Sequence, residues 1–301
     1  MTSLYESLRQ TALQMVSDGT LPIGFAYGFV INALICGVLI GPLLGGMGTM
    51  VVVKRMAFFS QAIGNSAMTG VAIGVLLGES VQQPYFSMFG FCILFGLLLN
   101  YTRNRTKMSP DTLIGVFLAV SLAMGSSLLL FVSAKVNTHI LEAVLFGSIL
   151  TVSDTDINVL LVVSILCVVV AVPLFNQLLL SSLNPTLAAA RGVRVRVLEY
   201  VFIVLITILT VACVKIIGAV LVEALLLIPA AAARNIVSSV RGFVAWSIGF
   251  STVSVLAGIY IPMQWDLALP SGGAIVLVAA LFFVVTTVIR VTSSRFREAR
   301  T

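Results

Sequence analysis

Charged residues are scarce in this sequence, and their scarcity excludes a water-soluble protein. Only 9% of the 301 residues are Asp, Glu, Lys or Arg, whereas soluble domains carry about a quarter. Hydrophobic residues make up 59% of the chain, and the mean hydropathy is +1.14. A polar surface cannot be built from this composition, so we expect an all-α polytopic protein embedded in a lipid bilayer.

The chain has a single histidine and no closely spaced pair of cysteines, which argues against a histidine-rich zinc site inside the membrane. Four cysteines occur, none in a CxxC pair, and each lies in an apolar run where it packs as a small hydrophobic side chain. The one histidine, His139, falls in an outer loop. It is interpreted as an exposed interfacial residue, with a role in handing over metal as the alternative.

A phosphate-binding loop is absent as well. Such a loop requires Gly-Lys followed by Ser or Thr, and no Gly-Lys dipeptide occurs in the chain. Nucleic acid is not an expected partner either, although the net charge is +6, because the basic residues lie in short loops between apolar runs.

Nine apolar runs have the length of membrane spans. They lie near residues 24–46, 59–77, 84–100, 112–132, 157–180, 198–217, 218–233, 242–262 and 273–290. Eight spans remain an alternative, because the sixth and seventh runs join tightly at Gly218 and residues 141–152 are ambiguous. Residues 1–22 lack the pattern of a cleavable signal peptide and predict an interfacial amphipathic helix, which leaves residues 23–301 as the transmembrane domain.

Basic residues orient these spans. With alternate loops on opposite sides of the membrane, 14 Lys and Arg residues fall on one side and three on the other. This asymmetry predicts that the richer side, with the carboxyl-terminal tail, is cytoplasmic. The three on the other side are Arg9, Lys135 and Lys215.

A polar stripe interrupts the second run. Gln61, Asn65 and Thr69 are four residues apart and share one side of a helix, with Met68 beside them. Hydrogen bonds between packed helices would explain isolated polar residues in a span. Three on one side favour a helix that lines a polar pathway, in which water and solute satisfy the amides and the hydroxyl.

The seventh run contains Glu223 with apolar neighbours on both sides. A carboxylate near the bilayer centre costs at least ~2.5 kcal/mol, so such a residue faces the interior of the helix bundle. Two interpretations stay open at this point. Glu223 marks a transport pathway, or it fixes helix packing through a hydrogen bond.

The loop at 183–196 predicts a short cytoplasmic helix near 184–192. Asn184 is a good N-cap, Pro185 suits the first helical position, and Gly192 is a natural stop. Two interpretations are open. The segment is a plain connection whose basic residues fix the orientation of the protein in the membrane, or it is a docking helix for a cytoplasmic partner.

Five blocks in a fixed order resemble the permease subunits of ABC importers for zinc, manganese and iron, and together they extend from about residue 30 to 290. They are GPLLGGMGTMVVVKRMAFFSQAIGNSAMTGVAIG, LFGSILTVSDTDI, NPTLAAARGV, IIGAVLVEALLLIPAAAAR and DLALPSGGAIVLV. No single block is decisive, and the assignment depends on their order and spacing.

The resemblance implies a fold like that of the vitamin and siderophore importers, in the bacterial cytoplasmic membrane. A second copy of the subunit, or a sister permease, would complete the pathway, and an external solute-binding protein would deliver the ion. The permease itself would bind no cofactor, and ATP would be used by two cytoplasmic ABC ATPases that dock on the short helix. The residues implied in coupling are Asn184, Pro185, Leu187, Ala188, Ala189, Arg191 and Gly192.

One departure from the family pattern concerns the substrate. Members of the family usually read Asp-Ala-x-x-His-Ala-x-x-Pro-Gly where this chain has Gln61 and Asn65 in place of the Asp and His. Amide oxygens are poor ligands for zinc. Either Glu223 supplies negative charge to a metal site shared with Gln61 and Asn65, or the permease carries a chelated or non-metal solute.

Two further classes are alternatives to an ABC permease. A secondary transporter would use Glu223 as a proton or sodium site. An intramembrane protease would need a Ser–His pair within the membrane, and His139, the one histidine, is predicted to lie outside it.

Overall fold

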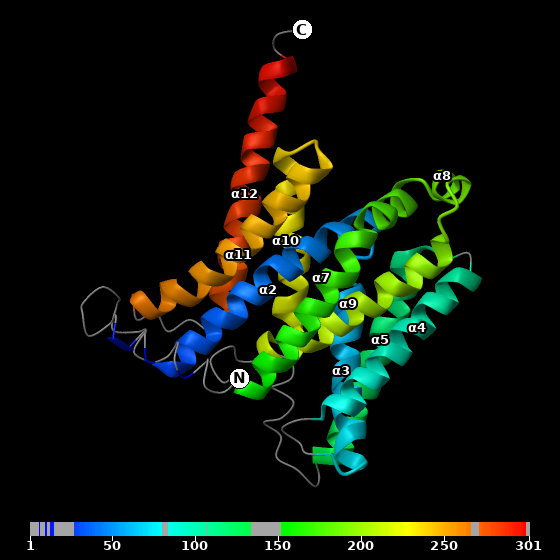
Figure 1. The fold of residues 1–301 in the computed structure, drawn as a ribbon, viewed down its shortest axis with the longest axis vertical. Helices are drawn as coiled ribbons and strands as arrows, with labels where there is room; N and C mark the ends of the chain where they lie inside the picture. Colours follow the sequence, from blue (N-terminus) through cyan, green and yellow to red (C-terminus); the bar gives the residue numbers. More distant parts are fainter. Residues whose placement is uncertain are drawn as a thin grey trace. The chain divides into compact units, whose positions relative to one another are not determined.

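The structure is a computed structural model that describes residues 27–79, 84–106, 108–133, 152–265 and 271–298, together with isolated positions near the amino terminus. Throughout these ranges the regular structure is helical, and no strand occurs in them. The helices, drawn in Figure 1, are α2 (Gly28–Val53), α3 (Phe59–Leu76), α4 (Tyr85–Arg105), α5 (Pro110–Ser133), α7 (Asp154–Leu183), α8 (Pro185–Ala190), α9 (Val195–Ile217), α10 (Ala219–Ile236), α11 (Val240–Gln264) and α12 (Ser271–Glu298).

Each of the nine apolar runs corresponds to one of the long helices, and eight of these are long and apolar enough to cross a membrane. The prediction of eight or nine spans is therefore confirmed. The ninth long helix is α3, which carries the polar stripe and does not reach the hydropathy of the others. The predicted interfacial helix at 1–22, His139 and most of the ambiguous piece 141–152 lie outside the residues that the structure describes.

The chain divides into two compact units. Unit 1 consists of Met1–Thr49, Ser148–Val162 and Ala224–Thr301, and unit 2 of Met50–Gly147 and Val163–Glu223. Three helices, α2, α7 and α10, contribute residues to both units because a unit boundary falls within each of them. Each unit is described below by itself.

In unit 1, small residues on α2 allow close approach to α11. A Cβ added to Gly41 would lie 2.7 Å from the Thr252 Cα, and one added to Gly45 would lie 2.7 Å from the Ser247 carbonyl oxygen. The Ser247 hydroxyl donates a 2.7 Å hydrogen bond to the Gly45 carbonyl. Small residues that let helix backbones approach are the usual means of helix association in lipid, where hydrophobicity gives little driving force.

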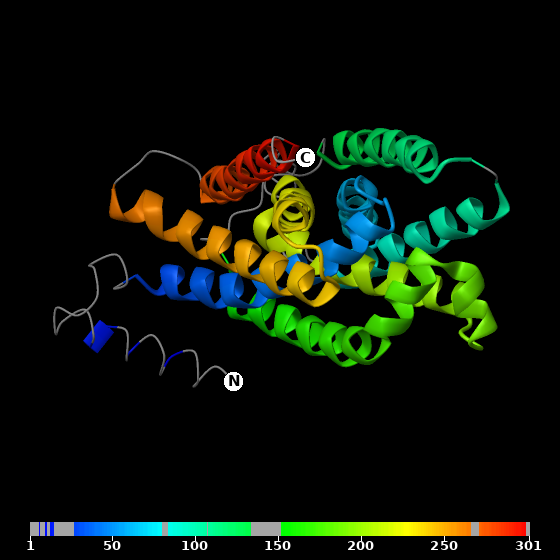
Figure 2. The same cartoon turned by 90° about the horizontal axis from the view of Figure 1, so that it is seen from above.

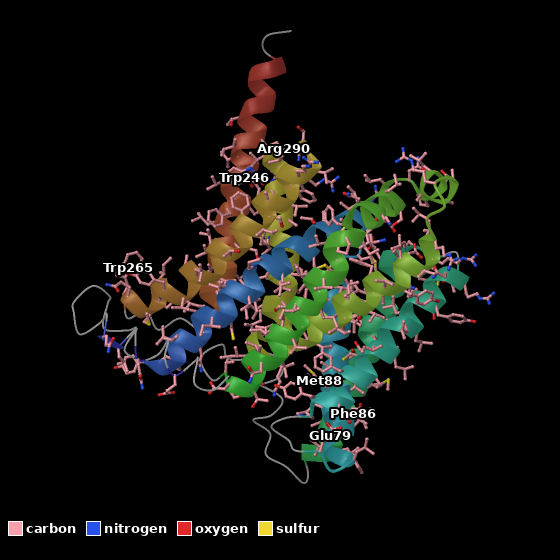
Figure 3. The ribbon with its side chains drawn as sticks, in the orientation of Figure 1. Glu79, Phe86, Met88, Trp246, Trp265 and Arg290 are labelled. Carbon is pink, nitrogen blue, oxygen red and sulfur yellow. The ribbon has the colours of Figure 1, made fainter. Side chains whose placement is uncertain are left out.

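Helix α12 packs on α11 and is fastened to α10. Gly258 of α11 makes close contact with Ile275 of α12. At another point along α12, Asn235 of α10 donates a 2.9 Å hydrogen bond to Thr287 and accepts a 3.1 Å hydrogen bond from Arg290, which is labelled in Figure 3. These polar contacts fix the rotation of α12 relative to α10.

In unit 2, α3 packs against α4, α5 and α9 and is almost completely enclosed. Fourteen of its 18 residues are buried. A Cβ at Gly70 would lie 2.8 Å from the Met88 Cα on α4, so a larger residue there would force the two helices apart. A helix that touches little lipid does not need to be strongly apolar, which explains why α3 carries polar residues.

The end of α3 and the start of α4 lie at one end of unit 2 and α8 lies at the other, and Figure 2 gives a second view of the same helices. At the α3–α4 end, Glu79 caps α4: its Oε1 accepts a 2.6 Å hydrogen bond from the Ser87 hydroxyl and a 3.2 Å hydrogen bond from the Ser87 backbone N–H. Glu79 and Met88 are labelled at this end of unit 2 in Figure 3.

Candidate functional site

The candidate pathway residues on α3 differ in their surroundings. Gln61 is half-buried, and Asn65 is buried with 8% of the residue exposed. Met68 and Thr69 are buried almost completely. The stripe that the sequence places on one side of a helix is therefore more accessible near the start of α3 and enclosed about a turn later.

Thr69 and Met68 face α5 within unit 2. A Cβ added to Gly125 of α5 would lie 3.3 Å from the Thr69 Oγ1, the Met68 Cβ and the Asn65 carbonyl oxygen. The Thr69 hydroxyl has no hydrogen-bond partner among the described residues. In the subunit by itself these two residues pack between α3 and α5, whereas Gln61 remains half-buried.

Glu223 lies on α10, where it is half-buried. Ala219, one turn earlier on the same face of α10, touches α3: a Cβ added to Gly64 would lie 2.9 Å from the Ala219 Cβ. Gly64 stands between Gln61 and Asn65 in the sequence. This contact brings the first turn of α10 against the segment of α3 that carries both amides, so the three candidate ligands come from adjoining helix segments of unit 2.

The donor atoms of these residues are the amide oxygens of Gln61 and Asn65 and the carboxylate of Glu223. Within the described ranges no three His, Cys, Asp or Glu side chains come together. Carboxylate and carbonyl oxygens suit harder ions such as manganese, whereas zinc prefers imidazole, thiolate and carboxylate.

Helix α8 has the local structure that the sequence predicts. The Asn184 Oδ1 accepts a 3.1 Å hydrogen bond from the Leu187 N–H and a 2.6 Å hydrogen bond from the Thr186 hydroxyl. At the other end, Gly192 adopts a φ of +77°, and the Val193 N–H donates to the Ala188 carbonyl at 3.0 Å. These are the bonds of a Schellman motif, so both ends of this six-residue helix are capped by its own sequence.

The residues of α8 that the resemblance implies in coupling differ in exposure. Leu187, Ala189 and Arg191 are exposed, but Ala188 is fully buried against the rest of the chain. Ala188 is therefore a packing residue that seats α8, and a partner would meet Leu187 and Ala189 instead.

A second polar cluster, which the sequence alone did not reveal, lies in unit 2. Arg103 of α4 forms a 3.1 Å ion pair with Glu199 of α9, and its other terminal nitrogen lies 3.1 Å from the Met56 sulfur. The Lys54 ammonium lies over the Phe202 ring, 5.2 Å from its centroid. The feature of the sequence that could have indicated this cluster is Glu199, an acidic residue close to three arginines at 191, 194 and 196.

The position of Lys54 in this cluster affects its protonation. Lys54 follows the last residue of α2 and is largely enclosed. Burial lowers the pKa of its ammonium; Glu199 opposes this effect, and the positive charge of Arg103 adds to it. The cluster thus fastens the α2–α3 turn to α4 and α9 through contacts that involve charge.

Comparisons with known proteins identify the relatives of the chain. The ABC 3 transport family matches residues 26–290. The chain is 31% identical over 257 residues to the manganese transport system membrane protein MntC of Listeria innocua, covering 85% of this chain and 89% of that protein. It is 28% identical to the high-affinity zinc uptake system membrane protein ZnuB of Haemophilus influenzae, covering 84% of this chain and 95% of that protein.

A solved structure shares the fold. It is PsaBC from Streptococcus pneumoniae in complex with Fab, in which one chain superposes with a TM-score of 0.75 at 27% identity. The superposition covers 95% of both chains.

Proposed function

This chain belongs to the ABC 3 transport family, and on that basis we propose that it is the membrane-spanning permease subunit of an ABC importer that carries a divalent transition metal ion into the cytoplasm. It is a multi-pass protein of the bacterial cytoplasmic membrane and a transporter subunit rather than an enzyme. The observation that carries the proposal is the family match over residues 26–290, supported by relatives named for manganese and zinc transport.

Two ATPase subunits are proposed to supply the energy. The exposed Leu187 and Ala189 of α8 would enter a groove on the ATPase, and the buried Ala188 would transmit its movement to the rest of unit 2. ATP would be bound by that partner and no cofactor by the permease. A solute-binding protein on the outer face and a second permease copy, or a sister permease, would complete the importer.

Manganese is the ion that the candidate ligands favour. The Gln61 and Asn65 amides and the Glu223 carboxylate would offer oxygen donors from α3 and α10, and these suit manganese better than zinc. A site of neutral amides and one carboxylate would bind the ion weakly enough to release it, which conduction through a pathway requires. Import of iron is supported less specifically, because the two relatives named above are described by manganese and zinc transport.

Uptake into sealed vesicles tests the proposal. The permease, its ATPase and the binding protein are reconstituted together, and accumulation of radioactive manganese, zinc and iron is measured with and without ATP. We expect ATP-dependent accumulation with manganese above zinc. Uptake of none of the three would favour a chelated or non-metal solute, and uptake driven by an ion gradient without the ATPase would support a secondary transporter.

A further inference from the structure

Asn100 on α4 is a fully buried amide, and neither its Nδ2 nor its Oδ1 has a hydrogen-bond partner among the described residues. Four hydroxyls among the described residues of the same unit are in the same state, those of Ser60, Thr69, Thr207 and Thr210. Two of them matter here: Ser60 Oγ on α3, with 1% of the residue exposed, and Thr207 Oγ1 on α9, with none. A buried amide or hydroxyl without a partner loses the hydrogen bonds it makes to water in the unfolded chain, and nothing replaces them. Buried polar groups in native proteins are usually paired, often with ordered water.

Two sets of contacts place Asn100 at the junction of three helices. At one level a Cβ added to Gly96 would lie 2.8 Å from the Thr207 Oγ1 and 3.5 Å from the Ile63 Cδ1, so α4, α9 and α3 meet there. At a second level Arg103 contacts Glu199 and Met56.

Asn100 and Ser60 lie between these two levels, and Thr207 lies at the first level, beside Gly96. Asn100 follows Gly96 by four residues and precedes Arg103 by three, so it shares their face of α4. Ser60 precedes Ile63 by three residues and therefore lies on the same face of α3, one turn closer to Met56. On α9, Ile203 stands four residues from both Thr207 and Glu199, so the three residues share one face. We call Ser60, Asn100 and Thr207 the Asn100 layer.

We propose that the Asn100 layer binds internal water, which joins α3, α4 and α9 through hydrogen bonds to the Asn100 amide and the Ser60 and Thr207 hydroxyls. Water fits because the amide presents both a donor and an acceptor, and each hydroxyl can do either. A metal or alkali cation does not fit: the amide N–H groups repel it, and Arg103, one turn away, adds positive charge.

The chain offers a matched pair of methionines for testing this site. Met56 is fully buried and contacts Arg103, one turn from Asn100, whereas Met88 is 2% exposed and lies near the opposite end of α4 (Figure 3). In brief X-ray radiolysis, a bound water yields hydroxyl radicals that oxidise the nearest side chains even when these are buried. The permease–ATPase complex in lipid nanodiscs is irradiated, and oxidation of both methionines is quantified by mass spectrometry.

We expect Met56 to be oxidised several-fold faster than Met88, and Asn100→Leu to reduce Met56 oxidation to the Met88 level. The control Ser121→Ala, which removes a buried hydroxyl of α5 already bonded to the Leu118 carbonyl, should leave Met56 oxidation unchanged. If Asn100→Leu does not accumulate in the membrane, Ser60→Ala replaces it as the test variant. We expect Ser60→Ala to lower the oxidation of Met56 as well.

Equal oxidation of the two methionines in the wild type would overturn the proposal. So would Met56 oxidation that persists in Asn100→Leu, because radicals from bulk solvent would then be its source. A change in Met56 oxidation on replacing sodium and potassium with choline would show a cation in place of water. The test does not depend on the transported solute, so its outcome is separate from that of the uptake experiment.

Discussion

A carboxylate among the apolar side chains of a membrane helix has to be compensated by charge, by hydrogen bonds or by a bound ion. Glu223 occupies such a place on α10, half-buried and one turn from the Ala219 contact with α3. The apolar neighbours of Glu223 on α10 contribute no compensation. We propose that it serves as a ligand to a transported cation, together with the amides of α3.

Replacing Glu223 with glutamine tests this role because the side chain keeps its size and loses its charge. We expect Glu223→Gln to lower manganese uptake by roughly tenfold, the effect of about 1.4 kcal/mol, with little change in the amount of protein in the membrane. Uptake in vesicles and immunoblotting of the membrane fraction measure the two quantities. A parallel loss of both would indicate that Glu223 serves helix packing.

Gln61 and Asn65 are the positions at which the family pattern expected from the sequence would place Asp and His. Introducing a carboxylate and an imidazole with the double variant Gln61→Asp, Asn65→His should shift preference toward zinc, because zinc favours these ligands. We expect the ratio of zinc to manganese uptake to rise by roughly tenfold, again about 1.4 kcal/mol.

The control for this double variant exchanges the two amides, Gln61→Asn with Asn65→Gln, which keeps the ligand type. Its zinc-to-manganese ratio should stay that of the wild type. An unchanged ratio in the Asp/His variant would mean that these residues do not contact the ion.

Among the elements, α8 is the clearest case in which local sequence is sufficient. Its N-cap, its first-position proline and its glycine stop each act on neighbouring residues, so the helix forms where the sequence predicts it. The direction in which each alanine points was not predictable, because three successive alanines offer no contrast between buried and exposed positions.

Aspartate substitutions on α8 distinguish the two faces. Ala189→Asp should leave the permease inserted and folded but abolish ATPase stimulation, because the charge meets the partner rather than the permease core. Ala188→Asp should reduce accumulation of the permease itself, since a carboxylate would be buried without a partner. ATPase activity and detergent-solubilised yield are the measurements. Normal ATPase stimulation in Ala189→Asp would exclude α8 as the docking element.

For the whole molecule, α3 shows how a helix of modest hydropathy is accommodated inside a membrane protein. It is the long helix that does not reach the hydropathy of a span, and it is enclosed by α4, α5 and α9. Side chains of these neighbouring helices therefore surround α3 where lipid would otherwise contact it. The position of α3 in the membrane then depends on packing within unit 2 rather than on how well α3 alone partitions into lipid.

An insertion assay tests this dependence. With residues 59–76 placed alone in a host protein, we expect poorer membrane insertion than with residues 157–174, a segment of equal length from the more apolar α7. Glycosylation reporters on either side of the segment measure the inserted fraction. Equal insertion of the two segments would show that α3 enters the bilayer without help from its neighbours.

The sequence by itself determined the membrane setting, the number of spans to within eight or nine, the caps of α8 and the family. Each of these follows from composition, from run length or from residues close together in the chain. The polar stripe on α3 and Glu223 on α10 were visible for the same reason, since polar groups stand out in an apolar run.

Only the tertiary structure decided which faces meet. It placed Thr69 and Met68 against α5, buried Ala188 while exposing Ala189, and paired Arg103 with Glu199 across 96 positions of sequence. The physical reason is that lipid and protein interior are equally apolar, so a hydrophobic side chain carries no mark of which one it faces. In this protein close approach at glycines and pairing of polar groups select the neighbours, and both depend on residues far apart in the chain.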